Sequence, residues 1–428
     1  MNKRYYPNLD ETLCREVLPN GLKVMVVPKP GFTKKMAYFV ADFGAVHTQF
    51  TLQGQSYQLP AGIAHYLEHK LFDLPGRDVT AEFAEMGAAV NAFTSYDITA
   101  YYFSGTEHFS DCLRLLLEFV STPYFTQESV EKEQGIIDQE IGMNADDPNT
   151  QVFENLTRAM FCHPIRQPIL GTEESIRRIT PELLELCHRA FYNPANMILC
   201  VVGDVDPEEV CAIARQVLGD EKRPMGEKAD FPPEAMAVLE PEIQTQMEVA
   251  MPMFNLGFKC EALDKGFDAI CREITGDLAA EVLFGEASQL YLQLYGDGLI
   301  DSSFGGGFET IDGCALLNCG GDSEHAHAVR DAILAEARRI VETGIPEASL
   351  LRMKRSAMGR RIRDLDSFDS TCFRLCAYEM SDFDYFCFPD VYDHITSAQI
   401  QAFLSQVVRQ ERSSLSIIQT LKEETPCD

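Results

Sequence analysis

Two histidines and one glutamate lie close together in the chain, in an arrangement that can bind a metal ion and use it. His65 and His69 are four residues apart, so on a helix they share one face and can reach one ion. Glu68 lies on the same side, where a carboxylate can serve as the base for a water molecule. The order H-x-x-E-H inverts the commoner H-E-x-x-H motif. The pattern predicts a hydrolytic metal site, and the alternative is an amphipathic helix with a polar outer face.

The residues around this motif predict the helix that must hold it. Ile63, Leu67 and Leu71 are spaced as the buried side of a helix over residues 61–72. A short helix is expected near residues 81–86. Strands are expected on both sides, over residues 14–28 (a hairpin with an Asn-Gly turn), 36–43, 88–94 and 98–103.

A metal site with two histidines and an open position needs a further protein ligand, and a later helix offers candidates. This long helix is expected to begin after Thr126, with Val130 and Ile137 on its buried side. Glu133 and Glu140 are seven residues apart, so they share a face close to that apolar stripe. Unpaired carboxylates are costly there, which indicates a bound cation. The alternative is a charge-rich face exposed to solvent, because other acidic residues lie on the same helix.

The motif H-Y-L-E-H at residues 65–69, followed by the segment from Glu133 to Glu140, resembles the pitrilysin/insulinase family of zinc peptidases. That family combines H-x-x-E-H with a downstream E-x-x-x-x-x-x-E. The resemblance implies that His65, His69 and Glu140 are the zinc ligands. It also implies that Glu68 is the general base and that Glu133 is a supporting carboxylate that orients a ligand or the water.

A second motif extends the resemblance to the binding of substrate. Asn91-Ala92-Phe93-Thr94 is similar to the N-A-x-T edge strand of the family, to which a substrate backbone adds as an extra strand. The implied substrates are peptides or unfolded segments. The size of the chain resembles bacterial two-domain members akin to the subunits of the mitochondrial processing peptidase. That subgroup implies a homodimer, or a heterodimer with a related inactive chain.

The two halves of the chain echo one another, which indicates a duplication. The helix start at Thr180 finds an echo at Thr396, and residues 126–140 resemble residues 346–360, with offsets of 216 and 220. These echoes predict an α+β fold of two duplicated domains. Each domain is expected to be a mainly antiparallel sheet packed with helices, and the two domains are expected to face each other across a cavity.

The echoes also predict where the domains begin and end. We expect an N-terminal catalytic, zinc-binding peptidase domain over residues 1–220 and a homologous domain that binds no metal over residues 239–428. The charged and proline-rich stretch 221–238 is the expected linker.

Several residues of the second half depart from what the family's chemistry requires. Met353 and Arg360 fall at the positions of the two acidic residues of the long helix, and Asp277–Phe284, opposite the zinc-site helix, has no histidine. Related enzymes carry a substrate-gripping arginine and tyrosine in a segment R-E-x-x-G-L-x-Y. Leu294 and Asp301 fall at those two positions here, which predicts a different peptide preference.

Composition excludes some other classes of function. The net charge of −30 argues against binding to nucleic acid or to an anionic membrane. The 14 cysteines include no C-x-x-C pair and suit reduced thiols. The N-terminus lacks the apolar region of a signal peptide. The chain also contains no run of about 18 apolar residues, which a membrane-spanning helix would need. A cytoplasmic location is therefore expected.

Two functions from different classes compete for this pattern. The favoured one is a zinc metalloendopeptidase in which Glu68 activates a water molecule. The alternative is a catalytically silent peptide-binding or assembly subunit of a heteromeric peptidase complex. The intact set of histidines and glutamates argues against the alternative, because a silent site is free to lose at least one of them.

Overall fold

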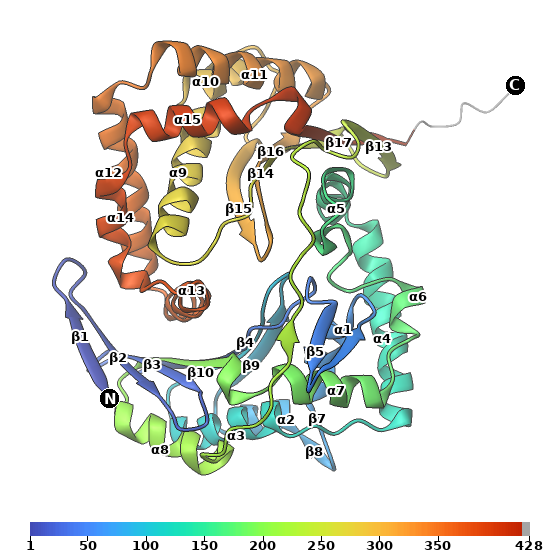
Figure 1. Cartoon of the computed structure of the whole chain (residues 1–428), viewed down its shortest axis with the longest axis vertical. Coiled ribbons are helices and arrows are strands. Elements are labelled where there is room, and N and C mark those ends of the chain that lie inside the picture. The colour runs from blue at the N-terminus through green and yellow to red at the C-terminus, as the bar shows by residue number, and fades with distance from the viewer. Residues whose placement is uncertain (422–428) are drawn as a thin grey trace, which may run out of the picture. The chain divides into compact units, whose positions relative to one another are not determined.

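Two β-sheets built on one plan form the framework of the chain, and helices cover them (Figure 1). The computed structural model describes residues 1–421. Most strand pairs are antiparallel, so the α+β class expected from the sequence is confirmed. The chain also divides into two compact units, so the two-domain organisation is confirmed as well.

The first sheet has seven strands in the order β1-β2-β3-β11-β4-β10-β9. The strand β11 is buried along its whole length and pairs in parallel with β3, while the other pairs are antiparallel. The strand bounds are β1 (Asn2–Tyr6), β2 (Glu11–Val17), β3 (Lys23–Pro28), β4 (Lys35–Ala41), β9 (Ala89–Thr94), β10 (Thr99–Gly105) and β11 (Met197–Gly203).

The second sheet repeats five of these strands in the order β13-β17-β14-β16-β15. Its one parallel pair, β13 with β17, corresponds to β3 with β11, and the antiparallel pairs follow in the same sequence. The predicted duplication is therefore confirmed at the level of topology. The strand bounds are β13 (Glu242–Met247), β14 (Met253–Cys260), β15 (Gly305–Ile311), β16 (Cys314–Asp322) and β17 (Ser413–Thr420).

A small three-stranded sheet was not expected from the sequence. The hairpin of β5 (Gln49–Leu52) and β6 (Gln55–Gln58) is extended by β12 (Glu227–Lys228). A two-stranded ribbon, β7 (Asp73–Leu74) with β8 (Arg77–Asp78), follows the first helix. Because β12 lies inside the segment 221–238, that segment is in part a strand rather than only a linker.

The helices also recur in matching order. Thr180 and Thr396 cap α7 and α15 with their hydroxyl groups, as the sequence predicts. The helices are α1 (Ile63–Leu71), α2 (Val79–Glu85), α3 (Phe109–Ser121), α4 (Gln127–Asp146), α5 (Pro148–Met160), α6 (Glu173–Ile176), α7 (Pro181–Phe191), α8 (Pro207–Leu218), α9 (Phe267–Phe284), α10 (Gln289–Gly296), α11 (Ala326–Thr343), α12 (Glu347–Asp364), α13 (Phe368–Met380), α14 (Phe388–His394) and α15 (Ser397–Val407).

Each half of the chain contributes one helix to the compact unit that the other half mainly forms. The first compact unit comprises residues 1–141, 168–230 and 360–388, and the second comprises 142–167, 231–359 and the chain from 389 onwards. These units differ from the continuous stretches 1–220 and 239–428 expected from the sequence. The reason is that α13 packs on β11 and β4, whereas α5 packs on β14 and β17.

Close packing explains how α5 reaches the second sheet. At Gly257 of β14, an added Cβ would come within 2.5 Å of the sulfur of Met160 in α5. In the first unit, Cys372 of α13 is fully buried and its thiol lies 3.9 Å from the backbone oxygen of Cys200 in β11. Each borrowed helix thus belongs to the core of the unit that it joins.

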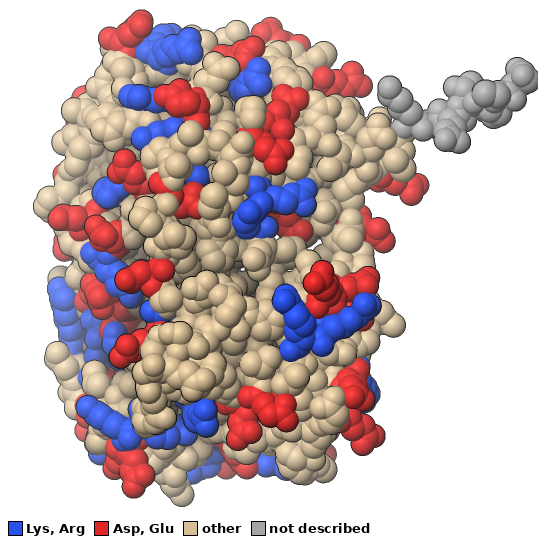
Figure 2. All heavy atoms as spheres, turned by 45° about the vertical axis from the view of Figure 1, so that its right-hand side comes forward, with Lys and Arg blue, Asp and Glu red and all other residues tan. Residues whose placement is uncertain are grey.

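The surface mixes charges of both signs despite the acidic composition. On the face shown in Figure 2, lysine and arginine side chains are interspersed among aspartate and glutamate side chains. Within residues 1–421, no helix has the length and apolarity that crossing a membrane requires.

Candidate metal centre

The helix that carries the motif begins at a position that only glycine can occupy without strain. Gly62 has a φ of 87°, and an added Cβ would lie 2.3 Å from the backbone oxygen of Leu170. Ser175 donates a hydrogen bond of 2.8 Å to the backbone oxygen of Ala61. The start of α1 is therefore fixed against the segment that leads into α6.

Two side chains of α1 attach it to the first turn of α4. Tyr66 is fully buried and its hydroxyl donates to the backbone oxygen of Val130. Lys70 is also fully buried, and its ammonium group donates to Asp73 and, at 3.3 Å, to the backbone oxygen of Ser129. These bonds hold the two helices in the relative position that brings their metal-ligand candidates together.

His65, His69 and Glu140 converge on one point. The Nε2 atoms of the two histidines lie 3.7 Å and 3.6 Å from Oε2 of Glu140. One ligand atom from each residue lies within 4.8 Å of the others, and no other group of this kind is found among residues 1–421. Two imidazole nitrogens and one carboxylate oxygen match the donor set of an open metal site, so the residues present fit a zinc ion.

The two histidines have different surroundings. His65 is 7% exposed, and burial, together with the charge of His69, lowers its pKa to about 3. Its ring is therefore neutral near pH 7, which is the form that binds metals. For His69, burial opposes protonation, but a hydrogen bond of 3.0 Å between its Nδ1 and Glu133 raises the pKa of the ring.

Glu133 lies next to His69 and is hydrogen-bonded to it. Burial alone would raise the pKa of its carboxyl group, yet the bond to His69 keeps that pKa below the usual value. Because the bond uses Nδ1, the Nε2 atom of His69 is left to point at Glu140.

Glu68 lies beside the candidate ligands and is hydrogen-bonded to a residue of β9. Its side chain is buried, and burial raises the pKa of its carboxyl group. Thr94 donates a hydrogen bond of 2.6 Å from its hydroxyl to Oε2 of Glu68. The sequence placed Thr94 only in the substrate strand. No local pattern joins residues 26 positions apart on a helix and a strand, so this contact was missed.

The strand β9 lies at the end of the first sheet, and its outer edge pairs with no other strand of the described chain. Asn91 is exposed on it, and its side-chain oxygen accepts from the backbone of Ala92. The ring of Phe93 lies 6.0 Å from the ring of Phe373 in α13. An unpaired edge of this kind can accept an extended peptide as a further strand.

The second unit carries different residues at two corresponding positions. Following the strand pairings outward from β11 and from β17, Phe308 takes the place of Thr94. The segment G-G-G-F at residues 305–308 therefore replaces N-A-F-T at residues 91–94. On α12, Met353 stands in place of a glutamate, as the sequence predicts.

The positions expected to grip the substrate chain carry no cation. Leu294 is buried in α10, and Asp301 is exposed and accepts a hydrogen bond from Ser303. Neither side chain can neutralise a peptide carboxylate in the way that an arginine does.

Two family models match the chain. The model described as insulinase (peptidase family M16) matches residues 55–173, which include every residue of the candidate metal centre. The model described as the peptidase M16 inactive domain matches residues 178–357, which lie mainly in the second half.

Relatives of similar length carry the name zinc protease. The uncharacterized zinc protease YmfH of Bacillus subtilis is 35% identical over 415 residues, 95% of this chain and 96% of that protein. An uncharacterized zinc protease of Rickettsia felis is 30% identical over 222 residues, 50% of this chain and 52% of that protein.

Solved structures share the fold over nearly the full chain. A putative M16-like peptidase from Alicyclobacillus acidocaldarius has a TM-score of 0.92 and 32% identity, covering 96% of this chain and 99% of that one. A peptidase M16 inactive domain from Pseudomonas fluorescens has a TM-score of 0.80 at 18% identity, covering 97% and 100%.

Proposed function

The chain belongs to the insulinase family of peptidases (peptidase family M16), and on that premise we propose that it is a zinc metalloendopeptidase. Its proposed substrates are peptides or unfolded segments. The observation that supports the proposal most strongly is the convergence of three ligand atoms next to the buried carboxylate of Glu68. Relatives named zinc proteases support the same class of activity.

His65, His69 and Glu140 would hold the zinc ion. When bound, the ion supplies a Lewis acid that polarises a carbonyl group and makes a water molecule acidic near pH 7. Glu133 supports this set by fixing which nitrogen of His69 faces the ion.

Glu68 would carry the proton transfers. Its carboxylate accepts a proton from the attacking water and delivers it to the nitrogen of the leaving amine. Its raised pKa brings it nearer to neutral pH, where a residue that both takes and gives a proton works best. Thr94 keeps the carboxylate in one orientation during both steps.

The free edge of β9 would bind the substrate. A peptide that adds to this edge is held through its backbone, which tolerates many sequences and requires an extended conformation. A folded protein does not offer such a segment, whereas a peptide or an unfolded terminus does.

Glu68→Gln tests the proposal, because it keeps the shape of the side chain and removes the base. Zinc content, measured by atomic absorption, is expected to stay unchanged, while cleavage of a quenched fluorescent peptide falls about 10²- to 10⁴-fold. Glu85→Gln, at an exposed position of α2, is the matched control and should cleave like the wild type. Cleavage by the Glu68 variant at the wild-type rate would show that the mechanism is wrong.

The silent-subunit alternative makes a different prediction. In that case the wild-type protein would bind zinc but cleave no peptide, alone or together with any chain that co-purifies with it from the native cell. The same purification distinguishes the proposed homodimer from a heterodimer with a related inactive chain.

A further inference from the structure

The second unit contains a cavity of about 200 Å³ between α9 and α15, next to the end of β14. Its lining includes apolar side chains, among them Phe308, Phe403 and Val407, together with the guanidinium groups of Arg272 and Arg412. The carboxylate of Glu261 and the polar side chains of Thr275, Gln399 and Gln406 also line it. None of these residues belongs to the candidate metal centre, so the cavity calls for an explanation of its own.

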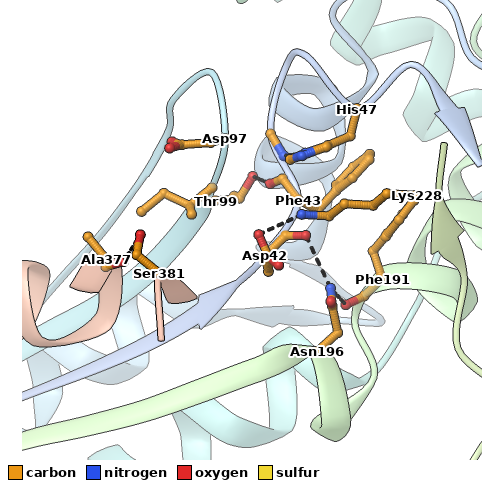
Figure 3. A network of polar contacts seen from close by, with 12 residues as sticks. Asp42, Phe43, His47, Asp97, Thr99, Phe191, Asn196, Lys228, Ala377 and Ser381 are labelled. Carbon is orange, nitrogen blue, oxygen red and sulfur yellow. Dashed lines mark hydrogen bonds and ion pairs between the residues drawn. The ribbon is translucent and has the colours of Figure 1, made fainter. Parts of the chain in front are cut away.

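The corresponding place in the first unit is filled by aromatic rings. The strand pairings and helix caps make Phe43 the counterpart of Cys260 and Phe191 the counterpart of Val407. The rings of Phe43 and Phe191 are stacked 4.1 Å apart, and Figure 3 shows both beside the polar network that surrounds them. The ring of Phe50 in β5 lies edge to face against the ring of Phe191, with the ring centres 4.9 Å apart. A thiol and an isopropyl group thus stand in the second unit where the first unit has two large rings.

The second unit also lacks the hairpin that covers this place in the first. The connection from β14 to α9 spans only residues 261–266, whereas the connection from β4 to α1 contains β5 and β6. Phe308 and Phe403 form an apolar wall, with their rings edge to face at 5.5 Å. Gly276 of α9 allows this, because an added Cβ would come within 2.4 Å of the ring of Phe308.

Two cations border this apolar space. Among the described residues, Arg412 has no carboxylate within ion-pairing distance. Its counterpart in the first unit is Asn196, which donates to the backbone oxygen of Phe191 (Figure 3). Arg272 lies 3.7 Å from Glu261, and both side chains are more than half exposed, so their attraction is weak. Because Glu261 also lines the cavity and offsets the charge of Arg272, Arg412 is the group that favours an anion there.

We propose that this cavity binds a carboxylate that carries an apolar body, such as an aryl-alkanoic acid. The body would occupy the space that aromatic rings fill in the first unit, and the carboxylate would pair with Arg412. The size is adequate, because an apolar cavity of about 150 Å³ in another protein accommodates benzene. A free acid and the C-terminal residue of a peptide share this chemistry.

The test is calorimetric titration of 3-phenylpropionate into the full chain. The protein is first treated with a chelator that removes zinc, so that the carboxylate of the acid cannot bind to a metal ion. Saturable binding of one molecule per chain is expected. Binding should weaken at least about tenfold in Arg412→Gln, since hydrogen bonds to charged groups are being lost. Arg409→Gln is the matched control, because Arg409 is exposed in the same turn and lies 3.9 Å from Glu411.

Two further titrations separate the apolar part from the charge. 3-Phenylpropanol, which lacks the carboxylate, should bind at least about tenfold more weakly than the acid. Val407→Phe restores the residue type of the first unit and should abolish binding by filling the cavity. Its unfolding midpoint shows whether it folds, and if it does not, Arg412→Gln decides.

Competition identifies the source of the carboxylate. Displacement of the acid by Gly-Gly-Phe, but not by its C-terminal amide, would assign the cavity to the end of a peptide. Displacement by neither would assign it to a free acid. The proposal is overturned if no saturable binding occurs up to about 10 mM, or if Arg412→Gln binds the acid as tightly as the wild type.

Discussion

The two histidines of the candidate metal centre differ in one hydrogen bond. The Nδ1 atom of His69 is bonded to Glu133, whereas the buried Nδ1 atom of His65 has no hydrogen-bond partner among the described residues. One candidate ligand is thus oriented by a carboxylate and the other by packing. The metal affinity should therefore depend on Glu133 although it is not itself a ligand.

Glu133→Ala is expected to weaken zinc binding about 10- to 100-fold, since partners of metal-bound histidines have effects of that size. Competition with a chromophoric chelator measures the affinity. Glu131→Ala is the matched control on the same helix, because Glu131 is exposed and bonds only to Gln127 among the described side chains. Equal affinities for the two variants would contradict the role assigned to Glu133.

Thr94 should affect turnover rather than metal content. Thr94→Val removes the hydroxyl that holds Glu68, so kcat is expected to fall about tenfold or more, in line with hydrogen bonds to charged groups. Thr94→Ser keeps the hydroxyl and should retain most activity. Peptide cleavage and zinc content are measured together. A rise in KM alone would instead place Thr94 in substrate binding only.

At the scale of elements, the centre depends on where α1 begins and on how α1 meets α4. The close approach of backbones at Gly62 fixes where α1 begins. The buried side chains of Tyr66 and Lys70 fix how α1 packs against α4. The long helix α4 then presents its carboxylates with helical spacing. A shift of α1 relative to α4 would therefore separate His65 and His69 from Glu140.

Gly62→Ala is expected to lower the free energy of unfolding by more than about 3 kcal/mol, from a left-handed backbone plus a clash with Leu170. Gly76→Ala is the control, since Gly76 also has a positive φ of 68° but has open space around it, and should cost about 1 kcal/mol. Denaturant unfolding measures both values. Similar costs would show that the close approach at Gly62 is not important.

At the scale of the whole molecule, one topology occurs twice with different chemistry. The first unit carries all the ligand candidates, and the second carries Phe308 where Thr94 stands and Met353 where a glutamate stands. The second unit has a cavity at the place where the first unit has stacked aromatic rings. The same topology thus holds different side chains in the two units.

We expect one zinc ion per chain, bound in the first unit. His69→Ala should remove it, whereas His327→Ala should not, because His327 is an exposed residue of the second unit that pairs with Glu242. Atomic absorption on dialysed protein gives the ratio. Two ions per chain, or retention of zinc by the His69 variant, would contradict this assignment.

Local patterns in the sequence were sufficient to predict much of the site and of the fold. Helical spacing alone puts His65 and His69 on one face, and puts Glu133 and Glu140 on one face of another helix. Capping residues marked the helix starts, and the repeated offsets revealed the duplication. These features depend on neighbours within a few residues, or on comparing one segment with another, so no tertiary structure is needed.

Contacts between distant segments were decided only in the tertiary structure. The bond from Thr94 to Glu68, the exchange of α5 and α13 and the addition of β12 to the β5–β6 hairpin leave no periodic trace in the sequence. The cavity beside Cys260 likewise lies where the first unit has two aromatic rings and a covering hairpin. Each of these depends on side-chain volumes meeting across the core, which close packing settles and local propensity does not.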